Sequence, residues 1–275
     1  MKALIALTMS ALRLHFRNKP AMFTTVLMPF IAYFIYMSIF AGGQPVRVLG
    51  FLAPVLILMA TTNGIYGVGG DLLMMRDNGT LIAYNLAPVS PTQVLISRIA
   101  LDFCMTLIVG AIQILLSIWL YHVVLHGHIA DLVIIAVISA ATLGSLGTIV
   151  VSISNSFFEA NIYSQIVFLV IFILSGLTLP VQYLPPAAQY VSHLLPTTLL
   201  VTSLTGIIVS GARFYNYWRE LVTLLGFIVT ALAVSSVLFR WDKDQFATRR
   251  DKLLACVALL PMVLSAILVH LISRR

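Results

Sequence analysis

The feature that most constrains this chain is a series of long stretches with almost no charged residue. Eight such stretches are 17 or more residues long. Wound as a helix, an apolar stretch of that length can cross the hydrocarbon core of a bilayer. The stretches are Ala21–Ala41, Gly50–Gly70, Phe103–Tyr121, Leu132–Phe158, Ile162–Leu179, Leu194–Ala212, Leu221–Phe239 and Leu253–Val269. They predict a polytopic membrane protein.

The composition excludes several other classes. Of the 275 residues, 60% are hydrophobic and only 9% are charged, which is more apolar surface than a soluble core needs. A β-barrel would show short alternating strands. We therefore expect an all-α bundle, because helices satisfy their own backbone groups in lipid. The net charge of +7 does not indicate nucleic-acid binding, since the basic residues flank the apolar stretches. Cys104 and Cys256 lie within apolar stretches and are expected to be buried thiols.

Residues 1–19 are predicted to form an amphipathic helix in the membrane interface, with the N-terminus in the cytoplasm. At about 100° per residue, a polar face and an apolar face separate. The polar face holds Lys2, Ser10, Arg13 and Arg17, and the apolar face holds Leu4, Leu7, Ala11 and Leu14. A frayed basic tail would satisfy the same charge rule and remains the alternative.

The stretch Leu194–Ala212 decides the number of spans. If it crosses the bilayer there are eight spans, and if it dips in and returns there are seven. Crossing would place a basic cluster outside, which the charge rule disfavours. That cluster is Arg240, Lys243, Arg249, Arg250 and Lys252. We therefore expect outer re-entrant helices over 181–212, a six-span core over 1–241, and a basic linker with an extra transmembrane helix over 242–275.

The polar segment 71–98 interrupts the apolar stretches and is too long for a simple connection. A charged turn at Arg76–Thr80 precedes a short apolar helix at Leu81–Leu86, and Pro88 and Pro91 follow. An interfacial linker of no special role is the alternative. The length of the segment, its apolar content and the turn-forming Asn-Gly and proline residues in it favour a docking element for another protein.

Polar residues inside the spans are candidates for a substrate path, because intramembrane polar groups face other helices or a cavity. The candidates are Thr61, Thr62, Asn63, Gln113, Asn161 and Gln165. Interhelical hydrogen bonding is the alternative for each of them. The triplet Thr61–Asn63 is the strongest candidate.

Several motifs together resemble the type-2 ABC transporter permeases. After a span that opens Phe51-Leu52-Ala53-Pro54, an Arg-x-x-Gly-Thr pattern at Arg76–Thr80 is followed by Ala-Pro-Val-Ser. The resemblance continues at Leu174–Val181, Leu184-Pro185, Leu195-Pro196 and Leu238–Arg240. It covers 1–241, and it implies the membrane subunit of an ABC exporter. The extra span after residue 241 departs from the family pattern.

The resemblance also implies roles for individual residues. It makes Leu72–Asn85 the coupling helix that contacts an ATPase, and Val181–Gly211 an outer cap or gate. The ATPase-coupling residues would be Asp71, Met74, Met75, Arg76, Asp77, Gly79, Thr80 and Pro88, with Glu159 as a second contact or a solvated loop charge. The outer gate would include Pro180, Pro185, Pro186 and Pro196.

No phosphate-binding loop is fused to the chain, since the sequence contains no Gly-Lys pair. The expected partners are therefore an ABC ATPase subunit carrying ATP and Mg, a second permease chain (identical or different) and the lipid bilayer of a bacterial plasma or inner membrane. No metal or cofactor is expected on this chain. The predicted function is export of an amphipathic drug, lipid or glycan. An ion-driven secondary transporter and a membrane-embedded enzyme are the alternatives.

Overall fold

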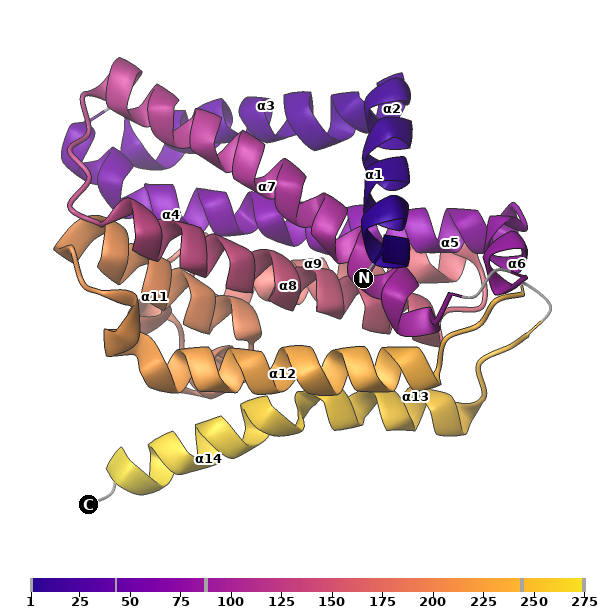
Figure 1. Cartoon of the computed structure of the whole chain (residues 1–275). Helices are drawn as coiled ribbons and strands as arrows, with labels where there is room; N and C mark the ends of the chain where they lie inside the picture. The colour runs from indigo at the N-terminus through magenta and orange to yellow at the C-terminus, as the bar shows by residue number, and fades with distance from the viewer. Residues whose placement is uncertain (1, 43, 87–88, 243–244, 274–275) are drawn as a thin grey trace.

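The computed structural model describes residues 2–42, 44–86, 89–242 and 245–273, which contain no strand. Most of the helices run side by side in one bundle (Figure 1). The elements before the middle of the chain are α1 Lys2–Arg17, α2 Lys19–Met22, η1 Phe23–Leu27, α3 Met28–Tyr36, η2 Met37–Ala41, α4 Pro45–Thr62, η3 Asn63–Val68, α5 Gly69–Asp77, α6 Thr80–Asn85 and α7 Pro91–Tyr121. The remainder are α8 Ile129–Ile153, α9 Phe157–Leu174, η4 Val181–Tyr183, α10 Pro186–Ser192, α11 Pro196–Ser210, η5 Phe214–Tyr217, α12 Trp218–Val237, α13 Arg249–Ala255, η6 Cys256–Leu259 and α14 Leu260–Ser273.

Five helices in the described part of the chain are long and apolar enough to cross a membrane. They are Pro45–Asp77, Pro91–Tyr121, Ile129–Ile153, Phe157–Leu174 and Phe214–Val237. The first apolar stretch of the sequence forms a shorter helix, Thr25–Ala41. The last apolar stretch of the sequence is divided among α13, η6 and α14. These elements lie against α12, and the Thr230 hydroxyl of α12 donates to the Ala258 carbonyl at 3.2 Å. The prediction of an all-α polytopic membrane bundle is confirmed.

The N-terminal helix α1 lies across the direction of the long helices (Figure 1). Its Ala11 is buried against Leu101 and Met105 of α7, while Arg13 and Arg17 are exposed. Leu14, on the expected apolar face, is nevertheless exposed. An amphipathic helix that lies in the plane of the membrane–water interface is expected to have this orientation and this separation of a buried face from a charged, exposed face.

The two ends of the bundle differ in their connections. The turn after α8, the end of α12 and the start of α13 meet at one end, because Arg240 bonds to Ser154 and Lys252 to Glu159. The turn before α8 and the end of α11 meet at the other, where the amide of His126 donates to the Ile208 carbonyl. We call the first of these the α6 end of the bundle and the second the α11 end (Figure 1).

The bent pair α10–α11 has the geometry of a re-entrant element. Its two helices meet at 87°. Helix α9 starts at the α6 end and α12 starts at the α11 end (Figure 1). The segment between them therefore does not traverse the bundle a further time. Pro186 and Pro196 each occupy the first turn of a helix, where the missing N–H removes no intrahelical bond.

The long helix Pro45–Asp77 is held against α8 by two glycines. A Cβ on Gly147 would collide with the Gly64 carbonyl oxygen, and a Cβ on Gly64 would lie 2.6 Å from the Leu143 carbonyl carbon. Gly64 belongs to η3, a π-helical stretch inside the long helix. Small residues allow this close backbone approach, which is the main source of helix association in lipid.

We expect Gly147→Ala to destabilise the protein by about 1–3 kcal/mol, because the new methyl group overpacks a backbone contact. The matched control is Gly67→Ala, since a Cβ at Gly67 meets nothing within 4 Å. The measurement is the heating midpoint of detergent-solubilised protein, followed by size-exclusion chromatography. Equal midpoints for the two variants would contradict the close contact.

The topology is tested with single cysteines at Asn216 and Gln245, both exposed, in a background without Cys104 and Cys256. The two native cysteines are removed because Cys256 is exposed and Cys104 is only half-buried. The expectation that both thiols are buried is therefore wrong. We expect an impermeant thiol reagent to label position 216 but not 245 in intact cells, because the basic cluster keeps the α6 end in the cytoplasm. The reverse pattern would mean that the bundle is inserted the other way round.

Candidate functional site

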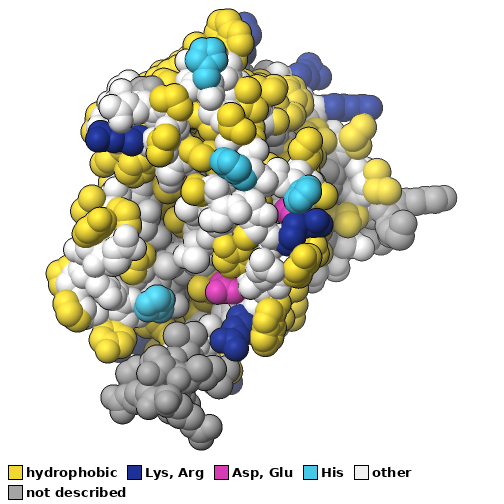
Figure 2. Space-filling model, turned by 90° about the vertical axis from the view of Figure 1, so that its left-hand side faces the viewer, with side chains coloured by type: hydrophobic (Ala, Val, Ile, Leu, Met, Phe, Trp, Pro, Cys, Tyr) yellow, Lys and Arg dark blue, Asp and Glu magenta, His cyan; other side chains and the backbone are white. Residues whose placement is uncertain are grey.

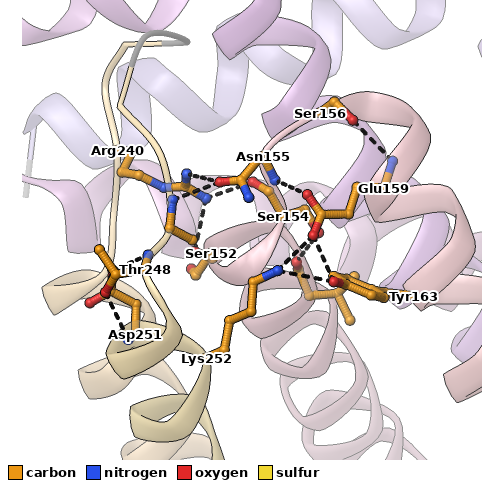
Figure 3. A network of polar contacts seen from close by, with 12 residues as sticks. Ser152, Ser154, Asn155, Ser156, Glu159, Tyr163, Arg240, Thr248, Asp251 and Lys252 are labelled. Carbon is orange, nitrogen blue, oxygen red and sulfur yellow. Dashed lines mark hydrogen bonds and ion pairs between the residues drawn. The ribbon is translucent and has the colours of Figure 1, made fainter.

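The carbonyl oxygen of Ser154 joins three parts of the α6 end. It accepts a hydrogen bond from Nη2 of Arg76 at 3.1 Å and another from Nη2 of Arg240 at 2.6 Å. The same Arg240 nitrogen also reaches the Ser152 carbonyl at 3.0 Å, and Nη1 reaches Oδ1 of Asn155 at 3.0 Å (Figure 3). Two arginines, one in α5 and one just after α12, thus bind the carbonyls that α8 leaves free at its last turn.

Glu159 lies in the first turn of α9 and accepts three hydrogen bonds from within the chain (Figure 3). The donors are Nζ of Lys252 at 2.7 Å, the Tyr163 hydroxyl at 2.6 Å and the Asn155 amide at 2.8 Å. A carboxylate in that turn is also favoured by the helix dipole. Glu159 therefore connects α9 to α13, and its role as a second ATPase contact stays a prediction.

The charges in this network remain ionised at neutral pH. Burial, and next the positive charge of Arg76, lower the pKa of Arg240 to about 10. The hydrogen bond to Glu159 raises the pKa of Lys252. The backbone amide of Thr248 holds the pKa of Asp251 below its usual range, and these two residues form the capping box that starts α13.

The coupling segment 71–98 is not one continuous helix. Residues 71–77 complete the long helix that began at Pro45, and the chain turns at Asn78 and Gly79 before α6. Gly79 has φ of +72°, a conformation that glycine adopts without strain. The expected coupling helix Leu72–Asn85 is therefore two helices joined by a turn. Pro88 lies outside the described residues.

The predicted coupling residues divide into buried and exposed side chains. Arg76 is buried and serves the internal network, whereas Met74, Asp77 and Thr80 are exposed, and Asp71, Met75 and Gly79 are half-buried. Exposed apolar side chains continue into α6 and just past its end. Ile82 is 41% exposed and Leu86 is 86% exposed.

A cavity of about 210 Å³ lies beside this segment, between α1, α5, α6 and α7. Its lining includes His15, Asp71 and Arg98, and Arg98 lies 3.8 Å from the Asp71 carboxylate. Burial lowers the pKa of His15. Sequence reasoning missed this cluster, because its titratable residues come from three separate helices.

The substrate-path candidates are only partly brought together. Asn63 and Gln113 line one apolar cavity. Thr61 and Thr62 donate instead to carbonyls of their own helix, at Ile57 and Leu58. Asn161 and Gln165 are on α9, which does not line that cavity, and Gln165 is exposed. No described residues form a group of three or more possible metal ligands.

At the α11 end, an ion pair holds the outer elements together. Nε of Arg213 lies 2.8 Å from Oδ2 of Asp131, whose side chain is fully buried. Among the gate prolines, Pro196 is buried, whereas Pro180, Pro185 and Pro186 are exposed. Hydrophobic and uncharged side chains cover most of this end, with a few histidine and basic side chains between them (Figure 2). Sequence reasoning did not single out Asp131 or Arg213.

Fold and site together define a polytopic α-helical membrane protein. It has an N-terminal helix that lies across the long helices, a short helix beyond the long span Pro45–Asp77, and a bent helix pair at the opposite end (Figure 1). Residues 2–209 match the family described as ABC-2 type transporter. The chain belongs to this family, and the resemblance seen in its motifs is confirmed.

Curated relatives are similar over part of their length. The "Inner membrane transport permease YhhJ" of Escherichia coli (strain K12) is 23% identical over 173 residues, which are 62% of this chain and 46% of the relative. The "Probable multidrug ABC transporter permease YbhR" of the same strain is 24% identical over 191 residues, 69% of this chain and 52% of the relative. The matches thus cover about half of each relative. No solved structure matches the chain.

We expect Glu159→Gln to loosen α13 from α9, because the neutral amide accepts more weakly from Lys252 and Tyr163. The partly exposed ion pair contributes on the order of 1 kcal/mol or less. The measurement is trypsin cleavage after Arg249 or Arg250 in permeabilised cells, which should become several-fold faster. Glu220→Gln, on the same protein but at the α11 end, is the control. Equal cleavage rates for both variants would refute the connection.

Proposed function

We propose that this chain is the membrane-spanning permease of an ATP-driven exporter, and that a separate ATPase binds at the α6 end. Membership of the ABC-2 type transporter family supports the transport role. The printed names of two relatives describe them as permeases. The single observation that carries the coupling proposal is the bond between Arg76 and the Ser154 carbonyl, which ties the helix before the Asn78–Gly79 turn to the bundle.

The geometry offers a path for motion from the surface to the spans. Helix α5 continues α4 and η3 without a break, in a helix of 33 residues. A displacement of α6 would therefore be transmitted along the long helix Pro45–Asp77. Arg76 passes the same displacement to the turn between α8 and α9, and Arg240 connects that turn to α12.

The surface proposed to bind the ATPase is made of exposed side chains near the Asn78–Gly79 turn. Met74 and Ile82 supply apolar area, and Asp77 supplies a charge whose carboxylate is 38% exposed. Apolar anchors surrounded by polar groups are typical of protein interfaces. Arg76 does not belong to this surface, since a buried arginine bonded to a carbonyl is held for internal connection.

At the opposite end, the re-entrant pair is proposed as the outer gate. Opening there would displace α11 from α8 and α12 and separate Arg213 from the buried Asp131. Separating Arg213 from Asp131 is costly for as long as the carboxylate stays buried away from water. The ion pair would thus hold the gate closed until ATP-driven motion of the spans offsets that cost.

An ion-driven transporter is the second candidate, on one observation. Asp102 of α7 is buried, and its Oδ2 has no hydrogen-bond partner. Buried carboxylates within spans mark ion or proton pathways. Asp102→Asn separates the two functions, because it would abolish ion-driven transport and leave ATP dependence unchanged in an ATP-driven exporter.

The proposal is tested by introducing a charge on the docking surface. We expect Ile82→Asp to reduce co-purification of the ATPase at least tenfold and to abolish ATP-dependent export, because the carboxylate would be desolvated at an apolar contact. Phe246→Asp is the matched control, since Phe246 is also apolar and 70% exposed at the α6 end.

Expression and membrane insertion are checked for both variants by quantitative blotting. Undiminished export in Ile82→Asp, or ATP hydrolysis by the purified permease alone, would overturn the proposal.

A further inference from the structure

The apolar cavity that Asn63 and Gln113 line has a volume of about 390 Å³ and lies between α4, η3, α7 and α8. We call it the lateral cavity. Its walls include Leu56 and Ala60 of α4, Gly110 of α7 and Ala136 of α8. Its volume lies within the range of small-molecule sites in proteins, about 300–1,000 Å³.

The lateral cavity opens toward the surface of the bundle that faces lipid. Side chains of its lining are exposed along α7 and at the start of α8, where Leu115 is 63% exposed and Ile129 is 80% exposed. These residues lie toward the α11 end of the two spans. A molecule dissolved in the bilayer could therefore enter from the side, without passing through water.

No charged residue of the described chain lines the lateral cavity. A phosphate, carboxylate or ammonium group placed inside would lose its hydration without gaining an ionic partner. The lining therefore selects uncharged ligands.

Two buried amide side chains give the lateral cavity a polar spot. Asn63 and Gln113 line it with exposed fractions of only 7% and 0%. Nδ2 of Asn63 and Oε1 of Gln113 have no hydrogen-bond partner within the protein. Nε2 of Gln113 donates to the Pro29 carbonyl at 3.2 Å, which fixes that side chain to α3. Leaving a buried amide group unpaired is unfavourable, and a ligand that bonds to it would remove that cost.

We propose that the lateral cavity binds an uncharged, lipid-like molecule. Its apolar chain enters from the bilayer, and its amide or hydroxyl group accepts from Asn63 and donates to Gln113. The inference rests on the proposed function in one respect, since this is the class of substrate that the exporter would carry. Binding itself requires neither ATP nor the ATPase.

The test uses a diazirine-bearing hexadecanamide in membranes that contain the full chain. Irradiation should place adducts on peptides from α4, α7 and α8, mapped by mass spectrometry. Ala136→Phe fills the lateral cavity and should reduce this labelling at least fivefold. Val222→Phe is the matched control, because Val222 is 61% exposed on α12 and does not line the lateral cavity.

A second variant guards against misfolding caused by the phenyl group. Gly110→Leu also enters the lateral cavity, since a Cβ there meets only Leu56, at 3.6 Å. Size-exclusion profiles of both filling variants should match the parent protein. Labelling that stays at the parent level in both filling variants would overturn the proposal.

The polar spot is tested separately by comparing the amide probe with the diazirine-bearing free fatty acid. We expect the parent protein to prefer the amide at least threefold, and Gln113→Met with Asn63→Leu to remove the preference while adducts still form. Equal labelling by both probes in the parent would reject the assignment. Because no readout depends on ATP, failure here is distinguishable from failure of the ATPase proposal.

Discussion

The close approach of Gly64 and Gly147 is the constraint on which the rest of the arrangement depends. In lipid, apolar side chains gain little by leaving the hydrocarbon, so helices associate where their backbones can pack. Here the long helix Pro45–Asp77 meets α8 with almost no space between main chains. The contact fixes the register of the two helices. That register brings Arg76, three turns further on, beside the free carbonyl of Ser154 at the end of α8.

Two ends of very different chemistry follow from this register. At the α6 end, arginines satisfy the last carbonyls of α8, and a short helix projects from a turn. At the α11 end, a re-entrant pair covers the spans, and its exit is tied to α8 by Arg213 and Asp131. In the proposed exporter, one end receives force and the other end opens. On that proposal, the buried Asp131 would make the α11 end costly to open, whereas the exposed α6 leaves the α6 end accessible.

The spans could be predicted from the sequence because lipid demands long uncharged helices. The orientation of each helix could not. Helix α9 is apolar on all sides, so nothing in its pattern showed that Gln165 faces away from the bundle. Arg76 looked like a surface charge because it sits in a polar segment, yet helix α5 continues the span and points it inward. The start of α7 at Pro91 was readable in principle, since Ser90 and Gln93 form a capping box.

The C-terminal extension packs against α12, where Ala258 and Met262 are buried, and Arg240 adds a better-shielded polar contact than the Glu159–Lys252 pair. Lys252 and Glu159 keep 36% and 24% of their side chains exposed, so solvent screens their attraction and the pair contributes about 1 kcal/mol or less. Arg240 is half-buried and makes four hydrogen bonds, three to carbonyls and one to Asn155. One of those carbonyls belongs to Gln245, so the arginine also folds the linker back on itself. Because the Ser154 carbonyl also accepts from Arg76, the segment that leads to the extension and the helix that leads into α6 are bonded to the same carbonyl oxygen.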